Sequence, residues 1–108
     1  MDCIAERRLE LRTQDGRIDV IVKLGRPELD VSGENWACQY ELWFGDTCKS
    51  MRMHGIDAMQ ALQLSTAILD VELEVRAEDL GGTLYYLDHP FTSILENSGL
   101  QRNSIDPK

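Results

Sequence analysis

The side chains with the most chemistry in this sequence lie between residues 38 and 54. Cys38, Cys48, Met51, Met53 and His54 carry thiol, thioether and imidazole groups, which are the soft ligands that monovalent copper prefers. Successive side chains of an extended strand point to opposite sides. Cys38 and the two methionines would therefore share one face, while Cys48 and His54 would share the other. This separation opposes a common metal site, so we expect no metal and no cofactor, and we expect the methionines to fill a core.

Cys48 is the best candidate nucleophile among the three cysteines, because Arg52 and His54 fall on its side of the strand. A reactive thiolate needs a base within hydrogen-bond reach. His54 lies six residues further along, about 20 Å at the rise of a strand, which is too far. His89 could approach only through the tertiary fold. We therefore predict no catalytic residue and a protein that is not an enzyme, with a thiol-dependent enzyme as the third hypothesis.

Composition limits the remaining classes. The net charge is −8 over 108 residues, and residues 55–108 hold nine acids against three bases. This field opposes nucleic acid and anionic membranes as partners and suits a basic protein. The glycines form no phosphate-binding motif, and no apolar segment resembles a signal peptide or a membrane span. Three cysteines without a C-x-x-C spacing are expected to stay reduced in the cytoplasm.

Residues 4–24 are predicted to form a β-hairpin. Leucine, isoleucine and valine alternate there with charged residues, which is the pattern of strands with one buried face. Asp15-Gly16 favours a two-residue type I′ turn, which would place Leu11 opposite Val20 and Leu9 opposite Val22. Ile21 would then face outward. Residues 25–35 are rich in turn formers and are expected to form a loop.

Residues 36–54 are predicted to form a second hairpin. Aromatic and aliphatic residues alternate with polar ones along both halves, and Gly45-Asp46 suits a type II′ turn with glycine first. This turn would place Trp43 opposite Cys48 and Gln39 opposite Arg52. The two methionines and the aromatic residues Trp36, Tyr40 and Phe44 would lie on the buried face. Trp43 would lie on the other face.

The one long helix is predicted from residue 57 to residue 80. Asp57 can cap it, Gln60 can complete a capping box, and Ile56 is placed to pack on Ala61 as a hydrophobic staple. Gly81 suits the left-handed position that follows a helix. Helical spacing predicts a buried stripe of Ala61, Leu64, Ile68, Val71 and Val75, widened by Leu62, Ser65 and Leu69 and opposed by Gln60, Gln63, Asp70 and Glu74.

The expected architecture is α+β. Four strands form an antiparallel meander, the helix packs on one of its faces, and residues 83–87 add a short fifth strand (ββββαβ). Residues 1–95 would form a single domain, and residues 96–108 would be a flexible tail.

Two motifs also connect the chain to a known family. Trp36-Ala37-Cys38-Gln39-Tyr40 fits W-x-C-x-Y, and the segment from Gly55 to Leu62 fits G-[IV]-D-[AS]-x-Q-A-L. Over residues 4–91 the sequence resembles a family of small uncharacterised bacterial domains that carry these motifs. The resemblance implies a bacterial stand-alone protein of unknown function, and it supplies no catalytic residues.

A helix that covers one face of the sheet leaves the other face open to a partner. Tryptophan and arginine are over-represented at binding hot spots, so the candidate binding residues share that face: Trp43, Ile21, Arg52, Glu41, Gln39, Cys48 and His54. We expect a non-enzymatic protein-binding module of immunity or adaptor type. The alternative is a homodimeric or small-molecule-binding module that uses the same face.

Overall fold

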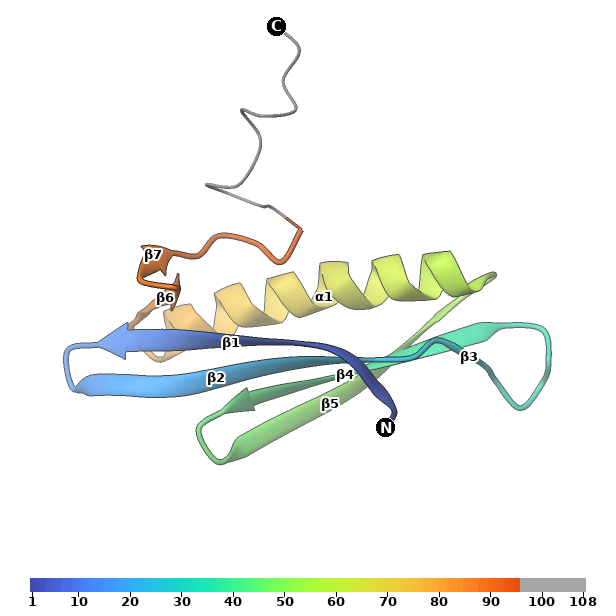
Figure 1. Ribbon diagram of the computed structural model, residues 1–108, viewed down its shortest axis with the longest axis horizontal. Coiled ribbons are helices and arrows are strands. Elements are labelled where there is room, and N and C mark those ends of the chain that lie inside the picture. The colour runs from blue at the N-terminus through green and yellow to red at the C-terminus, as the bar shows by residue number, and fades with distance from the viewer. Residues whose placement is uncertain (96–108) are drawn as a thin grey trace, which may run out of the picture.

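The computed structural model of this chain describes residues 1–95. Seven strands and one helix follow in the order β1 (Cys3–Thr13), β2 (Gly16–Gly25), β3 (Glu28–Leu29), β4 (Trp36–Phe44), β5 (Thr47–Gly55), α1 (Ala58–Asp79), β6 (Thr83–Tyr86) and β7 (His89–Pro90). The helix lies across one face of a twisted antiparallel sheet (Figure 1). The expected α+β class, with one helix and an antiparallel sheet, is therefore confirmed.

The four long strands are neighbours in the order β1-β2-β4-β5, which is the predicted meander. The sheet nevertheless has seven strands, whereas four strands and a short fifth were predicted. The two-residue strand β3 pairs with the start of β4, β6 pairs with β1, and the two-residue strand β7 pairs with β6. Strands of two residues carry no alternating pattern, so sequence periodicity could not reveal β3 and β7.

The predicted register of the first hairpin was wrong by two residues. Leu9 pairs with Val20 and Leu11 with Ile18, and the turn is formed by Gln14 and Asp15. Gly16 begins β2 and has a φ of 137°, whereas neither turn residue has the positive φ that a type I′ turn requires. Because a shift of two residues preserves the faces of a strand, the buried face is the predicted one.

The second hairpin has the predicted register. Trp43 pairs with Cys48, Gln39 with Arg52 and Tyr40 with Met51. Gly45 has a φ of 61° and Asp46 does not have a positive φ, as a type II′ turn requires. The turn therefore fixes which residues of β4 and β5 are neighbours.

The helix begins and ends as its capping residues indicate. The Asp57 side chain accepts a 2.7 Å hydrogen bond from the backbone N–H of Gln60, whose own side chain accepts one from the N–H of Ile56. Ile56 is 74% exposed, so the predicted staple does not form. At the other end Gly81, with a φ of 69°, and the N–H of Gly82 close a Schellman motif on Glu78 and Ala77.

The buried face of the helix differs from the predicted one. The buried positions follow a spacing of four residues and are Ala61, Ser65, Leu69, Leu73 and Ala77. Of the predicted stripe, Leu64, Val71 and Val75 are 38%, 55% and 46% exposed. Small side chains at Ala61, Ser65 and Ala77 let the helix lie close to the sheet, and the hydroxyl of Ser65 donates a 2.8 Å hydrogen bond to the Cys38 carbonyl. The predicted stripe thus contained the buried Ala61, Ser65 and Leu69 but not Leu73 and Ala77, because the helix has two apolar stripes and the prediction was centred on the other one.

The core lies between this helix face and the inner side of the sheet. Its members come from β1, β2, β4, α1 and β6 and include Leu11, Val20, Tyr40, Leu42, Leu69 and Leu73. Burial raises the pKa of the Tyr40 hydroxyl to about 12, with a further contribution from the charge of Glu72. The predicted C-terminal tail, 96–108, lies outside the described residues.

Candidate functional site

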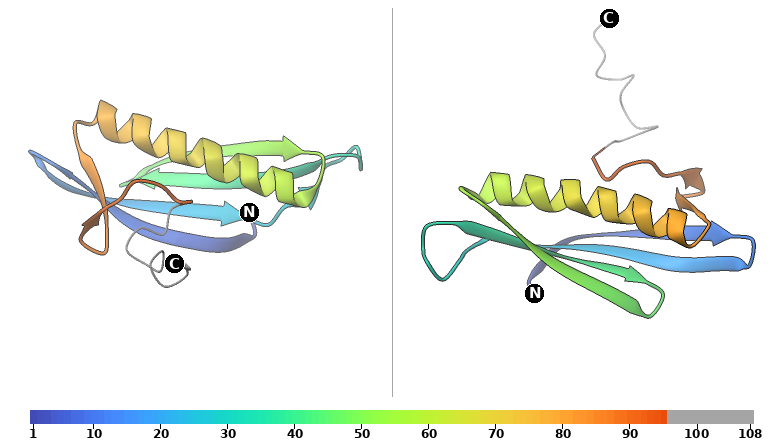
Figure 2. Two further views of the ribbon diagram at one scale, coloured as in Figure 1. Left: turned by 90° about the horizontal axis from the view of Figure 1, so that it is seen from above. Right: turned by 180° about the vertical axis from the view of Figure 1, so that it is seen from behind.

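The face of the sheet opposite the helix is not covered by any element of residues 1–95 (Figure 2). Strand alternation assigns to it every second side chain of the four long strands. All seven predicted binding residues belong to this set, because the core side chains of β2 and β4, such as Val20 and Leu42, have the opposite parity. We refer to this surface as the open face, and its other members include Arg8, Glu10, Arg12, Asp19, Lys23 and Ser50.

Ile21, Trp43 and Cys48 form a row across three adjacent strands. Ile21 pairs with Trp43, and Trp43 pairs with Cys48 on its other side. Ile21 and Trp43 are half-buried by their neighbours, while Cys48 is exposed. The Trp43 indole N–H donates a 3.2 Å hydrogen bond to a carboxylate oxygen of Glu41, which fixes the edge of the ring. The apolar pair Ile21 and Trp43 is therefore the centre of the open face.

Charged side chains surround this centre, and those that β1 contributes are already paired. Arg8 contacts Glu6 at 3.0 Å. Arg12 contacts Glu10 at 2.6 Å and lies 3.9 Å from the centre of the Tyr85 ring. The Arg12 hydrogen bond holds the pKa of Glu10 below its ordinary value. The charges of these groups are therefore neutralised by partners within the molecule. The contact of Arg12 with Tyr85 could not be predicted from the sequence, because the neighbour of strand β6 in the sheet was not predicted.

Arg52 differs from these paired arginines. Within residues 1–95 no ion pair or hydrogen bond joins its guanidinium to another side chain, although Gln39 is its partner on β4. Gln39 instead donates a 2.7 Å hydrogen bond to Ser50. The Arg52 guanidinium therefore offers its positive charge and five N–H hydrogen-bond donors to a molecule that binds the open face.

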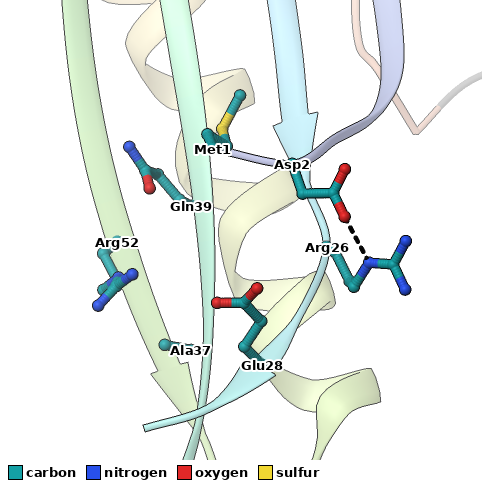
Figure 3. A pocket seen from close by; sticks show the side chains of 7 residues that line it. All are labelled: Met1, Asp2, Arg26, Glu28, Ala37, Gln39 and Arg52. Atoms are coloured by element: carbon teal, nitrogen blue, oxygen red, sulfur yellow. Dashed lines mark hydrogen bonds and ion pairs between the residues drawn. The ribbon is translucent and has the colours of Figure 1, made fainter.

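A shallow hollow of about 250 Å³ lies beside Arg52 (Figure 3). The helix is behind the sheet in this view, so the hollow opens on the open face. Its lining is polar, and an ion pair of 2.9 Å between Arg26 and Asp2 closes one side. A polar hollow smaller than about 300 Å³ does not have the apolar lining that ligand pockets usually have. The sequence prediction found only Gln39 and Arg52 here, because Met1, Asp2, Arg26, Glu28 and Ala37 come together through tertiary folding.

His54 is separated from the centre of the open face. It pairs with Ala37 near the end of β5, six residues from Cys48. At the rise of a strand this is about 20 Å, so the imidazole cannot serve as a base for the Cys48 thiol. The structure therefore brings Ile21, Trp43, Cys48 and Glu41 together, and it places Gln39, Arg52 and His54 toward the other end.

The Cys48 environment opposes a thiolate. Although Cys48 is exposed as a residue, neighbouring atoms remove part of the water around its thiol, which raises the pKa of that thiol. The charge of Glu41 raises the pKa further, and Lys23 lowers it by a smaller amount. An activated thiol has the reverse arrangement, with cations dominant. Cys38 is on the buried side with Met51 and Met53, and within residues 1–95 no group of three or more histidine, cysteine, aspartate or glutamate side chains could hold a metal ion.

A second hollow, of about 340 Å³, lies on the helix side of the sheet. It is formed between the C-terminal half of α1 and the segment from Gly82 to Thr92, with Leu73, Ala77, Leu84 and Phe91 in its wall. Beside it, Asp70 accepts hydrogen bonds from the hydroxyl of Ser93 at 2.7 Å and from the N–H of Ile94 at 2.6 Å. These bonds hold residues 93–94 along one flank of the helix.

The fold and the open face define a class of small α+β domain in which one helix covers one side of an antiparallel sheet. The chain belongs to a family described as a domain of unknown function, DUF6968, whose model matches residues 5–94. This match confirms the expected membership of a family without an assigned function. No curated protein and no solved structure matches the chain. The helix of residues 1–95 is not apolar enough over a sufficient length to cross a membrane.

Proposed function

We propose that this protein is a non-enzymatic bacterial module of the cytoplasm, of immunity or adaptor type, whose open face binds another protein. One observation carries the proposal. Ile21 and Trp43 form an apolar centre within a charged rim, on a sheet face that no element of residues 1–95 covers. Protein interfaces commonly combine an aromatic centre with a polar rim.

The charges of the open face indicate what the partner presents. The net charge of −8 favours the approach of a protein with positive charge. At the surface itself, Arg52 lacks an ion pair within residues 1–95 and suits a carboxylate of that partner, while Trp43 suits an apolar side chain. The partner is therefore basic overall. At the contact it carries an apolar residue opposite Trp43 and an acidic residue opposite Arg52, which lies four residue pairs further along β4 and β5.

The test is a binding measurement with the purified partner. The wild-type protein captures its partner from the native cell, and isothermal titration then compares variants. Trp43→Ala should weaken binding by about 30-fold or more, as expected for a hot spot of about 2 kcal/mol. Leu87→Ala is the control, because Leu87 is 75% exposed and lies outside the open face.

Circular dichroism must show that both variants keep the wild-type fold. A folded Trp43→Ala protein with the wild-type affinity for every captured partner would remove the open face from the binding function. Loss of affinity in Leu87→Ala as well would mean that the effect is not specific to the open face.

A further inference from the structure

The helix carries a second apolar stripe that the described part of the chain, residues 1–95, leaves largely exposed. Leu64, Ile68, Val71 and Val75 follow each other at intervals of four, three and four residues. This is the spacing of the seam by which one helix packs against another. Leu64, Val71 and Val75 are exposed, and Ile68 is only partly buried. We refer to these four residues as the helix seam.

The helix seam lies on the flank of α1 that is turned toward β5. Glu72 marks this flank, because its carboxylate contacts the ammonium of Lys49 on β5 at 2.7 Å. Ile68 and Val75 are its neighbours at i−4 and i+3. The opposite flank is occupied, since Asp70 there binds Ser93 and Ile94. In the view from above, residues 90–95 lie on the β1 side of the helix, and no segment of residues 1–95 runs beside the helix above the sheet on its other side (Figure 2).

The charges along the helix indicate the orientation of a matching helix. Residues 58–69 contain no charged side chain, whereas residues 70–79 contain five acids and one arginine. A parallel neighbour of the same sequence would place acids beside acids. An antiparallel neighbour places the acidic half of each helix beside the uncharged half and the positive dipole end of the other. It also sets Leu64 against the partner's Val75, and Ile68 against the partner's Val71.

We propose that the helix seam is a dimer interface, in which two copies of this chain pack their α1 helices antiparallel about a two-fold axis. This dimer leaves both open faces free, so it does not rest on the proposed partner binding. A 22-residue helix is about 33 Å long, and a strip about 12 Å wide gives roughly 400 Å² per copy. Met51 of β5, which is 37% exposed on the helix side of the sheet, widens this strip. Because stable interfaces bury about 800 Å² per partner, we expect a dissociation constant in the micromolar range.

The first test is analytical ultracentrifugation of the full chain from about 2 to about 500 µM. The ionic strength is set at about 0.15 M, since two copies of charge −8 repel each other at low salt. The wild type should pass from monomer to dimer in this range. Val71→Glu should weaken the dimer by at least about tenfold, because it places a charge in the centre of the seam. Val31→Glu is the matched control, since Val31 is fully exposed in the loop before β4.

The second test determines the orientation. In a Cys3→Ser, Cys48→Ser background, a tagged Leu64→Cys chain is mixed with an untagged Val75→Cys chain and treated with a short thiol cross-linker. The antiparallel dimer should yield the mixed product. Predominant self-products would show parallel helices and overturn the proposal.

Three further results would overturn the proposal. These are a wild type that stays monomeric at every concentration, an assembly that Val71→Glu leaves unchanged, and an assembly that Val31→Glu dissolves equally well. Loss of partner binding in Trp43→Ala with an intact dimer would concern only the open face, so the two proposals can fail separately.

Discussion

Glu41 acts on two neighbouring side chains of the open face, Trp43 and Cys48. Its carboxylate accepts the hydrogen bond of the Trp43 indole, and its charge adds to burial in raising the pKa of the Cys48 thiol. The same residue therefore orients an aromatic anchor and suppresses a thiolate next to it. A surface of this kind is suited to contact and is not suited to nucleophilic attack.

The pKa of Cys48 can be tested by alkylation. In a Cys3→Ser background, Cys48 should react with iodoacetamide more slowly at neutral pH than an unperturbed thiol, because less of it is ionised. Glu41→Gln removes the negative charge and should increase the rate at pH 7.5, by less than about tenfold, since one pKa unit is a factor of ten in thiolate. The measurement is the pseudo-first-order rate between pH 6.5 and pH 9.5, followed by mass spectrometry.

Glu28→Gln is the matched control, because Glu28 pairs with Ala37 at the other end of the sheet. A rate for Cys48 above that of a free thiol at neutral pH would contradict this account and would favour the thiol-dependent enzyme. An equal increase in both variants would show that the overall charge is responsible.

At the scale of elements, the junction between β5 and α1 holds the two layers in place. Gly55 ends β5 so close to the helix that an added Cβ would lie 2.6 Å from the backbone nitrogen of Ala61. Two residues later Asp57 caps the helix through the N–H of Gln60. The position of α1 over the sheet therefore depends on one residue without a side chain and one side-chain carboxylate.

Substitutions at this junction should follow an order. Gly55→Ala should lower the free energy of unfolding by about 3 kcal/mol, the upper end of overpacking, because the contact is with backbone. Asp57→Ala should lower it by about 1 kcal/mol through loss of the cap, and Asp57→Asn should have little effect because asparagine also caps. Urea unfolding at a fixed protein concentration measures all three, since the proposed dimer would make stability depend on concentration. Equal stability of Gly55→Ala and the wild type would contradict the close contact.

The elements also show how far sequence reasoning could reach. The Gly45-Asp46 turn determines the β4–β5 register by local chemistry, so that register and the pairing of Trp43 with Cys48 were predictable. The turn before β2 was placed one residue late, because Asp15-Gly16 is a strong type I′ signal and Gly16 serves instead at the start of the strand. The two-residue error left the faces unchanged, so Ile21 was still assigned correctly to the open face, where it pairs with Trp43.

The helix was harder to orient from sequence. Two stripes have helical spacing, and the prediction was centred on the more apolar one, with Leu64, Val71 and Val75, and included only part of the other, Ala61, Ser65 and Leu69. The sheet instead receives the stripe with alanine and serine, because small residues allow the two layers to approach. Hydrophobicity alone cannot decide which apolar stripe of a helix packs against its own sheet and which one packs against a second copy of the chain.

The hollow beside Arg52 was beyond sequence reasoning for another reason. It forms where Met1 and Asp2 return to the end of β2, and an ion pair between Asp2 and Arg26 fixes that contact. The two residues are 24 positions apart, and nothing in their local sequence indicates that they meet.

At the scale of the whole molecule, the two proposed surfaces lie on opposite sides. The open face is below the sheet in Figure 1, while the helix seam is on the helix above it. A dimer through the helices would therefore present two open faces outward. Two partner molecules could bind one dimer, which would increase the strength of attachment to a multivalent target.

The most direct measurement of the central proposal is a nuclear magnetic resonance titration of the ¹⁵N-labelled protein with its captured partner. The two tryptophans provide an internal comparison, because Trp43 lies on the open face and Trp36 has the parity of the buried face. We predict that the indole N–H signal of Trp43 and the amide signals of Ile21 and Arg52 shift or broaden with partner, while the indole signal of Trp36 is unchanged. Changes confined to α1 or to Trp36, with Trp43 unaffected at saturation, would contradict the proposal that the open face binds the partner.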